Sequence, residues 1–502
     1  MNSNCAIKNC AITNRNTTMD TKTLRQKILD LAIHGKLVPQ DPNDEPASVL
    51  LERIKAEKER LIKEGKIKRS KKSAKTSDTP HYGNVPFEIP SSWVWCKLEN
   101  ITVLIEDCPH TTAKDEGEGY PLVRTPNIGE GQLLLDGVHR VSKEVYDKRN
   151  IRAVPQVNDI IYAREAPAGN AAVIRENEQV CLGQRTVLIR PMDTLIDSVW
   201  LTYAILAPYS RNHLTSKATG STVSHVNMAS IRPFDLPLPP ISEQHRIVAE
   251  IRRWFALIDQ IEQGKSDLQA TIKQTKNKIL DLAIHGKLVP QDPNDEPAIE
   301  LLKRINLDFT PCDNGHYAQL PDGWCVVTLK DLCENINGLW KGKKEPFVNV
   351  GVIRNANFTK DFKLDYSNIE YIDVEQRTFA KRHLENGDLI VEKSGGSDNN
   401  PVGRTILYEG KSGVFSFSNF TMVLRMRYND TILSKYLYYC ILAKYQTGAM
   451  RLMQTQTTGL HNLILDKFLL MSICLPPLYE QRRIIDQIET IFTTLNLIME
   501  SL

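Results

Sequence analysis

Apolar residues recur at alternating intervals of four and three along the middle of the chain. From Ile247 the positions are 247, 251, 254, 258, 261, 265, 268, 272, 275, 279 and 282, and nine of the eleven are apolar, the exceptions being Lys265 and Thr275. This heptad spacing is typical of a helix that packs along one seam against another helix. A helix from Ser242 to His285 would be about 65 Å long at ~1.5 Å per residue, and Gly264 is a position where it could bend.

The same spacing occurs near both ends of the chain. It joins Leu24, Ile28 and Leu31 at the start, and Ile484, Ile488, Ile491, Leu495, Ile498 and Leu502 at the finish. An apolar seam needs a partner to cover it. We therefore expect two long antiparallel coiled-coil helical regions, one continuous and one split between adjacent chain termini. The alternative that these residues only cover local cores stays open.

The chain also repeats itself. The block KILDLAIHGKLVPQDPNDEPA begins at Lys27 and recurs without change at Lys278. Two further segments are echoed: IPSSWVWCKLENI from Ile89 by LPDGWCVVTLKDL from Leu320, and LPPISEQHRIVAEIRRWF from Leu238 by LPPLYEQRRIIDQIETIF from Leu475. Each half has the same order of block, variable region, LPPxxEQxR segment and helix, which indicates a pseudo-twofold molecule.

The variable regions, residues 85–236 and 318–473, have a different pattern. Short β-branched runs such as DIIYA, TVLIR, DLIVE and TMVLRMR alternate with Gly, Asn, Asp and Pro, and a helical segment follows near the end of each region. This predicts two globular domains of mixed α/β (α+β) fold. The remaining segments are expected to be a disordered leader (1–18), an N-terminal helical segment with a basic linker (19–84), a central helical spacer (237–317) and a C-terminal helical spacer (474–502).

Composition narrows the function classes. The net charge is only +3, so a polyanion would have to be bound by local basic faces. The longest apolar runs fall far short of the ~20 residues of a membrane span, so we expect no membrane partner. The ten cysteines form no CxxC pair and no zinc-like spacing, and no secretory signal is present, which favours a reduced cytoplasmic location and no metal site.

Motifs for catalysis on DNA are missing from the sequence. A DNA adenine methyltransferase would need a Gly-rich cofactor loop and an Asn/Asp-Pro-Pro-aromatic segment, whereas the two Pro-Pro pairs stand in Leu-Pro-Pro-Ile and Leu-Pro-Pro-Leu. A motor would need GxxxxGK[ST], which GLWKGKK does not match. We therefore assign no catalytic residue. A stand-alone methyltransferase and a purely protein-binding coiled-coil scaffold remain as alternatives.

The duplicated order of motifs resembles the specificity subunit of type I restriction-modification enzymes over nearly the whole chain after Asp20. The resemblance implies that each variable region is a target-recognition domain that reads one half of a bipartite, asymmetric site in double-stranded DNA. It implies that the helical regions set the spacing and dock two modification subunits, which bind S-adenosylmethionine and methylate adenine. Restriction subunits that use ATP and Mg²⁺ would join them, and this chain would bind no cofactor itself.

Polar, Gly-rich loops are the places where base edges and phosphates are contacted. In the first domain, REAPAGN, GQR and SKATGSTVSHVN supply the candidates Arg164, Asn170, Gln184, Arg185, Lys217, Ser221, Thr222, Ser224, His225 and Asn227. In the second, EKSGGSDNNPVGR and QTQTTGLHN supply Lys393, Ser394, Ser397, Asn399, Asn400, Arg404, Gln456, Thr457, Thr458, His461 and Asn462, and GLWKGKKEP adds Lys341, Lys343 and Lys344 for phosphates. For each residue an ordinary turn or cap is the alternative.

Partner docking is expected at the EQxR motifs. The candidates are Glu243, Gln244 and Arg246 with their counterparts Glu480, Gln481 and Arg483. The alternative is that these residues cap helices or form salt bridges within the chain. His34 and His285, in the repeated block, are expected to be satisfied at a helix end rather than to bind a ligand.

Overall fold

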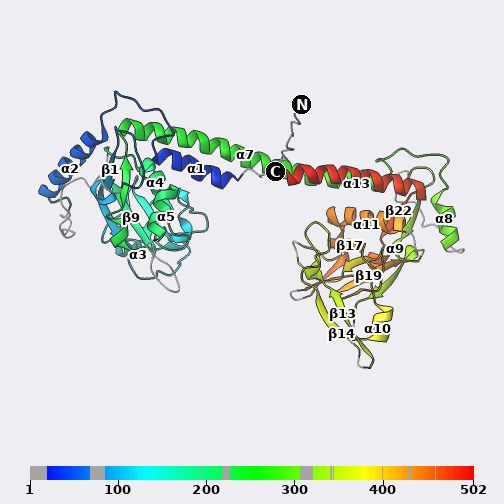
Figure 1. Ribbon diagram of the computed structural model, residues 1–502. Coiled ribbons are helices and arrows are strands. Elements are labelled where there is room, and N and C mark those ends of the chain that lie inside the picture. Colours follow the sequence, from blue (N-terminus) through cyan, green and yellow to red (C-terminus); the bar gives the residue numbers. More distant parts are fainter. Residues whose placement is uncertain are drawn as a thin grey trace, which may run out of the picture. The chain divides into compact units, whose positions relative to one another are not determined.

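The computed structural model describes residues 20–502 except 68–84, 193, 217–225, 306–319, 340–341, 343, 398–399, 428–430 and 458–459. The predicted leader and most of the basic linker lie outside these residues. The chain divides into two compact units, Met1–Gly264 and Lys265–Leu502. Helix α7 (Ile241–Ile284) begins in the first unit and ends in the second (Figure 1).

The first unit contains a five-stranded sheet of order β2-β9-β6-β7-β4, a three-stranded sheet β5-β3-β8 and the pair β1-β10. Helix α4 packs against β7 and β4. Its elements are α1 (Thr21–Ile33), α2 (Ala47–Lys63), β1 (Val94–Lys97), β2 (Thr102–Asp107), β3 (Tyr120–Val123), β4 (Glu130–Gly131), β5 (Arg140–Val141), α3 (Lys143–Arg149), β6 (Ile160–Ala163), β7 (Ala171–Val173), β8 (Cys181–Leu182), β9 (Thr186–Pro191), α4 (Ser198–Leu206), α5 (Pro208–Ser216), α6 (Met228–Ile231) and β10 (Asp235–Leu238).

The second unit contains sheets of order β12-β19-β15-β17, β14-β13-β18 and β16-β21-β20, and the pair β11-β22. Its elements after α7 are α8 (Ala298–Ile305), β11 (Cys325–Thr328), α9 (Leu329–Leu332), β12 (Cys333–Asn337), β13 (Phe347–Ile353), β14 (Glu370–Glu375), α10 (Gln376–Lys381), β15 (Leu389–Glu392), β16 (Ser394–Gly396), β17 (Thr405–Leu407), β18 (Phe415–Phe417), β19 (Thr421–Met426), α11 (Thr431–Gln446), β20 (Gln454–Thr457), β21 (Leu460–Leu463), α12 (Leu465–Leu469), β22 (Ser472–Leu475) and α13 (Leu478–Glu500).

The two units share one frame. The antiparallel trio β2-β9-β6 of the first corresponds to β12-β19-β15 of the second, and the closing pair β1-β10 corresponds to β11-β22. A buried aspartate directly before β6 and before β15 pairs with an arginine on the neighbouring strand: Asp159 with Arg190 at 2.7 Å, and Asp388 with Arg425 at 2.8 Å. The predicted mixed α/β character of both variable regions is confirmed, while the predicted domain boundaries stay predictions.

Each unit also pairs two of the helices that carry heptad spacing. In the first, Arg25 of α1 pairs with Asp259 and Glu262 of α7 at 2.5 and 3.3 Å. In the second, Lys276 of α7 donates to the Asn496 side chain of α13 at 2.5 Å and lies 5.6 Å from the centre of the Phe492 ring. These contacts follow the predicted pairing within each unit. The continuous coiled coil, the pseudo-twofold arrangement and the adjacent termini stay predictions.

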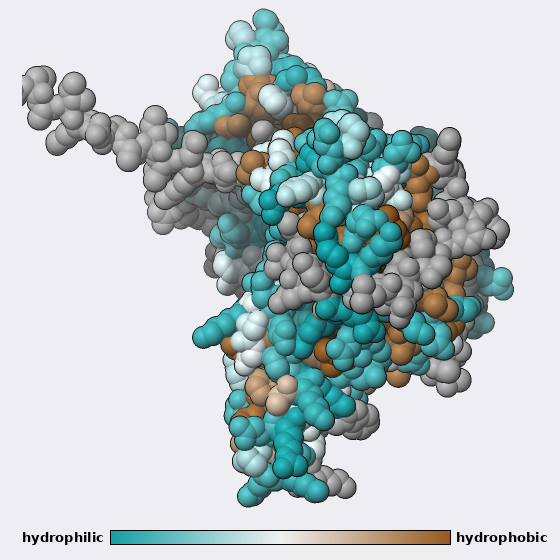
Figure 2. Space-filling view, turned by 90° about the vertical axis from the view of Figure 1, so that its right-hand side faces the viewer, coloured by the Kyte–Doolittle hydropathy of each residue, from teal (hydrophilic) through white to brown (hydrophobic). Residues whose placement is uncertain are grey.

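The apolar seam of α7 is buried unevenly. Ile247, Ile251 and Ile258 belong to the core of the first unit, which also contains the buried face of α1. Three other seam residues remain 37%, 38% and 39% exposed, namely Trp254, Ile261 and Leu268. Figure 2, turned by 90° from Figure 1, shows a face on which hydrophilic side chains predominate over separate apolar patches. Among the described helices, none is both long and apolar enough to cross a membrane.

The repeated block folds the same way in both units. Helix α1 is followed by the C-cap residue His34, whose Nδ1 lies 2.7 Å from the Asp30 carbonyl, and His285 has the same 2.7 Å contact with the Asp281 carbonyl. Both histidines are therefore satisfied at a helix end, as predicted. The following glycines, Gly35 and Gly286, have φ of +64° and +66°, a conformation that suits glycine because it lacks a Cβ.

These glycines also allow a close approach. A Cβ on Gly35 would lie 2.4 Å from Cγ of Pro90, and one on Gly286 would lie 2.4 Å from Cγ of Pro321. The two prolines begin the Pro-x-x-Trp segments that lead into β1 and β11. The block therefore packs against the start of its domain in each unit, and only glycine fits at the point of contact.

We predict that Gly35→Ala destabilises the protein by about 2–4 kcal/mol, because a left-handed alanine is strained and its methyl group overlaps the Pro90 ring. Gly65→Ala is the matched control: Gly65 has φ +69° but nothing within 4 Å of a built Cβ. The Gly65→Ala substitution should lower the free energy of unfolding by only about 1 kcal/mol. Urea unfolding measures both, and equal losses would show that the contact with Pro90 is unimportant.

Candidate nucleic-acid interface

Three of the predicted segments of the first unit meet at Arg164, directly after β6. The backbone N–H of Arg164 donates to the Arg185 carbonyl at 2.9 Å, and its own carbonyl accepts from the N–H of Val226 at 3.0 Å. These bonds join REAPAGN, GQR and the end of SKATGSTVSHVN, although the segments lie far apart in sequence. The structure thus brings these predicted segments together.

The Arg164 side chain holds this junction in place. Its Nη1 donates to both carboxylate oxygens of Asp107 at 2.7 and 2.9 Å, and its Nε donates to the Val226 carbonyl at 2.8 Å. Only 12% of the side chain is exposed. Arg164 is therefore engaged within the protein, and its partner Asp107, at the end of β2, was not among the residues chosen from the sequence.

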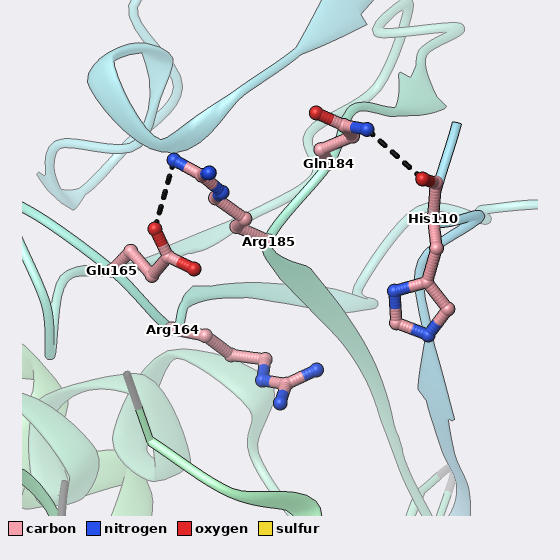
Figure 3. A pocket seen from close by; sticks show the side chains of 5 residues that line it. All are labelled: His110, Arg164, Glu165, Gln184 and Arg185. Atoms are coloured by element: carbon pink, nitrogen blue, oxygen red, sulfur yellow. Dashed lines mark hydrogen bonds and ion pairs between the residues drawn. The ribbon is translucent and has the colours of Figure 1, made fainter. Parts of the chain in front are cut away.

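A hollow of about 350 Å³ lies beside this junction (Figure 3). It is lined by His110, Arg164, Glu165, Gln184 and Arg185. Arg185 pairs with Glu165 at 2.9 Å and keeps 57% of its side chain exposed, while Nε2 of Gln184 donates to the His110 carbonyl at 3.0 Å. Guanidinium, amide and imidazole groups at one exposed place can contact phosphates and base edges.

The other candidates of the first unit are less accessible or lie elsewhere. Nδ2 of Asn170 donates to the Ile128 carbonyl at 2.9 Å and its Oδ1 accepts from Arg211, so its amide serves the fold. Asn227 is the N-terminal cap position of α6. Outside the described residues lie Lys217, Ser221, Thr222, Ser224 and His225.

In the second unit, the two main predicted segments form one small sheet. Strand β16, from the SGG stretch, pairs with β21 of the QTQTTGLHN hairpin, with Ser394 opposite Asn462. The Ser394 hydroxyl donates to Oδ1 of Asn462 at 2.6 Å. Segments more than sixty residues apart in sequence are therefore neighbours, as the equivalent segments are in the first unit.

The remaining candidates of the second unit lie at other described positions or outside the described residues. Ser397 and Asn400 are exposed and close a turn, while Arg404 pairs with Glu392 at 3.3 Å and stacks 5.2 Å from the Phe358 ring centre. Lys344 is exposed and His461 is buried. Outside the described residues lie Lys341, Lys343, Asn399, Thr458 and the side chains of Gln456 and Thr457, whose backbones belong to β20.

Lys393 occupies the place that Arg164 has in the first unit. Its N–H donates to the Phe420 carbonyl at 2.9 Å, and its carbonyl accepts from the N–H of Leu463 at 2.8 Å. Nζ of Lys393 reaches Oδ1 of Asn337, at the end of β12, at 3.3 Å. Partial burial lowers the pKa of this lysine, because its charged form is poorly solvated there.

The matching backbone bonds define pairs of equivalent residues in the two units. Asp107 and Asn337 end equivalent strands, opposite Val187 and Met422 respectively. The pairs are Arg164 with Lys393, Asp107 with Asn337, Gln184 with Asn419, and Arg185 with Phe420. The same frame therefore presents different side chains in the two units.

Asn419 and Phe420 were missed in the sequence. The sequence pattern that points to these two residues is the similarity of GQRTVLIR, from Gly183, to SNFTMVLR, from Ser418. The β-branched runs predict the strands of these two segments but do not by themselves align the three residues before each strand. The hydrogen bonds at Arg185 and Phe420 now give that alignment.

The EQxR motifs lie at the start of α7 and α13 and bind other parts of the chain. The Glu243 carboxylate accepts from Nε1 of Trp93 at 2.8 Å and from Nε2 of Gln40 at 2.5 Å. Glu480 accepts in the same way from Trp324 at 3.0 Å and from Gln291 at 3.1 Å. In each unit one carboxylate thus joins the repeated block, the Pro-x-x-Trp segment and the LPP-led helix.

The other two residues of each motif strengthen this junction. Arg246 pairs with Asp44 of the block at 2.6 Å, and Arg483 pairs with Asp295 at 2.5 Å. Nε2 of Gln244 donates to the Pro239 carbonyl at 3.0 Å, and Nε2 of Gln481 donates to the Pro476 carbonyl at 2.9 Å. We call these contacts, with those of the glutamate, the EQxR clamp.

The four glutamate and glutamine side chains of the two clamps are not part of the protein surface. Glu243 and Gln244 are both 0% exposed, and Glu480 and Gln481 are buried as well. Arg246 and Arg483 each keep 35% of the side chain exposed. The alternative of salt bridging within the chain thus describes what the motif does here, while its part in docking a partner stays a prediction.

We predict that Trp93→Phe destabilises the first unit by about 1–3 kcal/mol, because the buried carboxylate of Glu243 loses a donor. Burial raises the pKa of Glu243 above 4.5. Removing a donor penalises the ionised form, so the loss should grow as pH rises through this pKa. Urea unfolding at several pH values measures it.

Trp95→Phe is the matched control, because the ring N–H of Trp95 is buried and donates to no atom of the described residues. It should show a smaller loss that does not grow with pH. A similar pH-dependent loss in both variants would contradict the role assigned to the Trp93–Glu243 bond.

The described residues contain no group of three or more His, Cys, Asp or Glu side chains arranged to hold a metal ion. Cys96, Cys181 and Cys333 are buried, and burial raises the pKa of each thiol. These cysteines are therefore protonated core residues. The chemistry that the described interface offers is hydrogen bonding and ion pairing.

Comparison with known proteins agrees with the two-unit frame. The family model for the type I restriction modification DNA specificity domain matches twice, at residues 90–270 and 321–501. The chain is 28% identical to the type I restriction enzyme EcoEI specificity subunit of Escherichia coli, over 94% of this chain and 89% of that protein. It is 32% identical to the E. coli EcoAI specificity subunit, over 67% of this chain and 66% of that protein.

A solved structure supports the fold. A chain from a structure of the type I R-M system, described in terms of complex assembly and conformational transition, matches with a TM-score of 0.53 and 19% identity. The match covers 82% of this chain and 93% of that chain. With two family-model matches that together span most of the sequence, the chain belongs to the family of type I restriction-modification specificity subunits, the non-catalytic DNA-recognition components of these systems.

Proposed function

We propose that this subunit reads a bipartite, asymmetric target in double-stranded DNA, with one domain for each half-site. The observation that carries the proposal is the pairing of equivalent positions. A matching backbone bond joins Arg164 to Arg185 in one unit and Lys393 to Phe420 in the other, and the side chains of Arg164 and Lys393 contact those of Asp107 and Asn337 respectively. Two domains that share a frame but present different donors and acceptors read different bases.

The exposed residues of each interface divide into two roles. Arg185 and Gln184 in the first unit, and Asn419 with Ser397 in the second, present donors and acceptors for base edges. Lys344 and the neighbouring lysines of GLWKGKKEP contact phosphates, which fix the register of the protein on the duplex. Arg164 and Lys393 support these loops, since their own polar groups are engaged within the protein.

Two modification subunits dock on the repeated segments in this proposal. Two copies of one partner need two equivalent surfaces, and each unit contains the same block fixed by the same EQxR clamp. Since the clamp's glutamates and glutamines are buried, they position the docking surface, and the exposed side chains of the block contact the partner. S-adenosylmethionine belongs to the modification subunits, and ATP with Mg²⁺ belongs to restriction subunits, all in the cytoplasm.

The proposal is tested by exchanging one domain. Residues 318–473 are replaced by those of a relative with another target, the variant is assembled with its modification subunit, and methylated adenines are mapped by sequencing. We expect one half-site to change and the other to persist. The reciprocal exchange of 85–236 should change only the other half-site. A change in both half-sites from either exchange would contradict the assignment of one domain to each half.

Helix α7 sets the gap between half-sites in this proposal, because it is the element that both units share. Inserting four helix-forming residues after Thr271, which is exposed, adds ~6 Å. The permitted gap should lengthen by nearly two base pairs at ~3.4 Å each. The same insertion after Gly65, outside α7, is the control and should leave the gap unchanged. Mapping the methylated adenines measures the permitted gap for both insertion variants. An unchanged gap after the α7 insertion would contradict the proposal.

A further inference from the structure

Phe420 is an apolar side chain placed among polar groups of the candidate interface. Its residue surface is 47% exposed, whereas Phe417 and Met422, three residues before it and two after it, are fully buried. The chain therefore directs one aromatic ring outward between two apolar side chains that enter the core. Its equivalent in the first unit is Arg185, which lines the hollow of Figure 3.

The backbone of Phe420 is held firmly. Its carbonyl accepts from the N–H groups of both Lys393 and Ser394, at 2.9 and 3.2 Å. The N–H of the next residue, Thr421, donates to the Ser418 carbonyl at 3.0 Å, which closes a tight turn around Phe420. The backbone therefore holds the Cα of Phe420 in place, next to Lys393 and Ser394, which the sequence predicted to contact DNA.

The chemistry of the ring restricts what it can recognise. Phenyl carbons neither donate nor accept conventional hydrogen bonds, so Phe420 cannot read the polar edge of a base. In the major groove the one apolar group is the 5-methyl of thymine, and phenylalanine is among the side chains that contact it. Arginine at the equivalent place in the first unit instead suits the acceptors of guanine.

We propose that Phe420 contacts the 5-methyl group of a thymine in the half-site read by the second unit, and so is a specificity-determining residue. The proposal rests on the proposed function, because it assumes that this unit reads DNA. Lys393 and Ser394, whose N–H groups hold the Phe420 carbonyl, are positioning residues for it.

Uracil tests this contact directly, because it differs from thymine only by lacking the methyl group. Once the target is mapped, each thymine of that half-site, on either strand, is replaced in turn by uracil. Binding by the assembled methyltransferase complex is then measured. We expect one replacement to weaken binding by the wild type about four-fold, as burial of one methyl group would suggest.

Phe420→Ala should weaken binding to the unmodified target roughly tenfold, and the critical uracil should cause no further loss in this variant. Leu470→Ala removes an apolar side chain that is 58% exposed, between α12 and β22, and is the matched control. It should bind like the wild type and keep the full loss at the critical uracil. Thermal unfolding of all three proteins checks that the substitutions leave the fold intact.

Other results would overturn the inference. If the half-site contains no thymine, or if wild type and Phe420→Ala lose the same affinity at every uracil, the ring does not read a methyl group. A ring that wedges between stacked bases would give this second result, because its binding does not depend on one methyl group. Failure of the proposed function is distinct: the wild-type complex would then bind no bipartite target, with or without uracil.

Discussion

The buried carboxylates of Glu243 and Glu480 are the constraint on which the rest of the structure depends. A carboxylate removed from water is costly unless donors surround it, and here the donors come from two distant segments, a tryptophan of the Pro-x-x-Trp turn and a glutamine of the repeated block. If one segment moves away, an unsatisfied charge stays in the core. Three segments that are remote in sequence are thereby obliged to remain together, and the first and last strands of each domain, β1 with β10 and β11 with β22, adjoin this point.

A fixed frame leaves the exposed positions free to vary. The side chains that differ between the units, such as Arg185 against Phe420 and Gln184 against Asn419, stand on loops that share a backbone bond, from Arg164 to Arg185 in one unit and from Lys393 to Phe420 in the other. Changing such a side chain alters the surface without removing a buried contact, so recognition can change at little cost in stability. The side chains that support the loops differ more conservatively: arginine with aspartate in one unit becomes lysine with asparagine in the other.

Much of this architecture could be predicted from the sequence. The heptad spacing located α7 and α13, the identical block marked equivalent helix ends, and β-branched runs marked the central strands. The role of Glu243 could not be predicted, because periodicity does not show which segment covers the first turn of a helix. The exposure of Trp254 and Ile261 likewise depends on which helix faces them. Phe420 was missed because an exposed ring in a loop has no sequence pattern of its own. Its equivalence to Arg185 follows from aligning GQRTVLIR with SNFTMVLR, which the hydrogen bonds at the two carbonyls support.

The closure of the EQxR clamp within each unit has a consequence for how the protein loses its structure. Arg246 forms an ion pair with Asp44, and Arg483 forms one with Asp295, and both partners of each pair belong to the same unit. We therefore expect melting to be cooperative within each unit, with two transitions instead of one in calorimetry. At a temperature between the two transitions, a molecule would keep one unit folded and have the other unfolded.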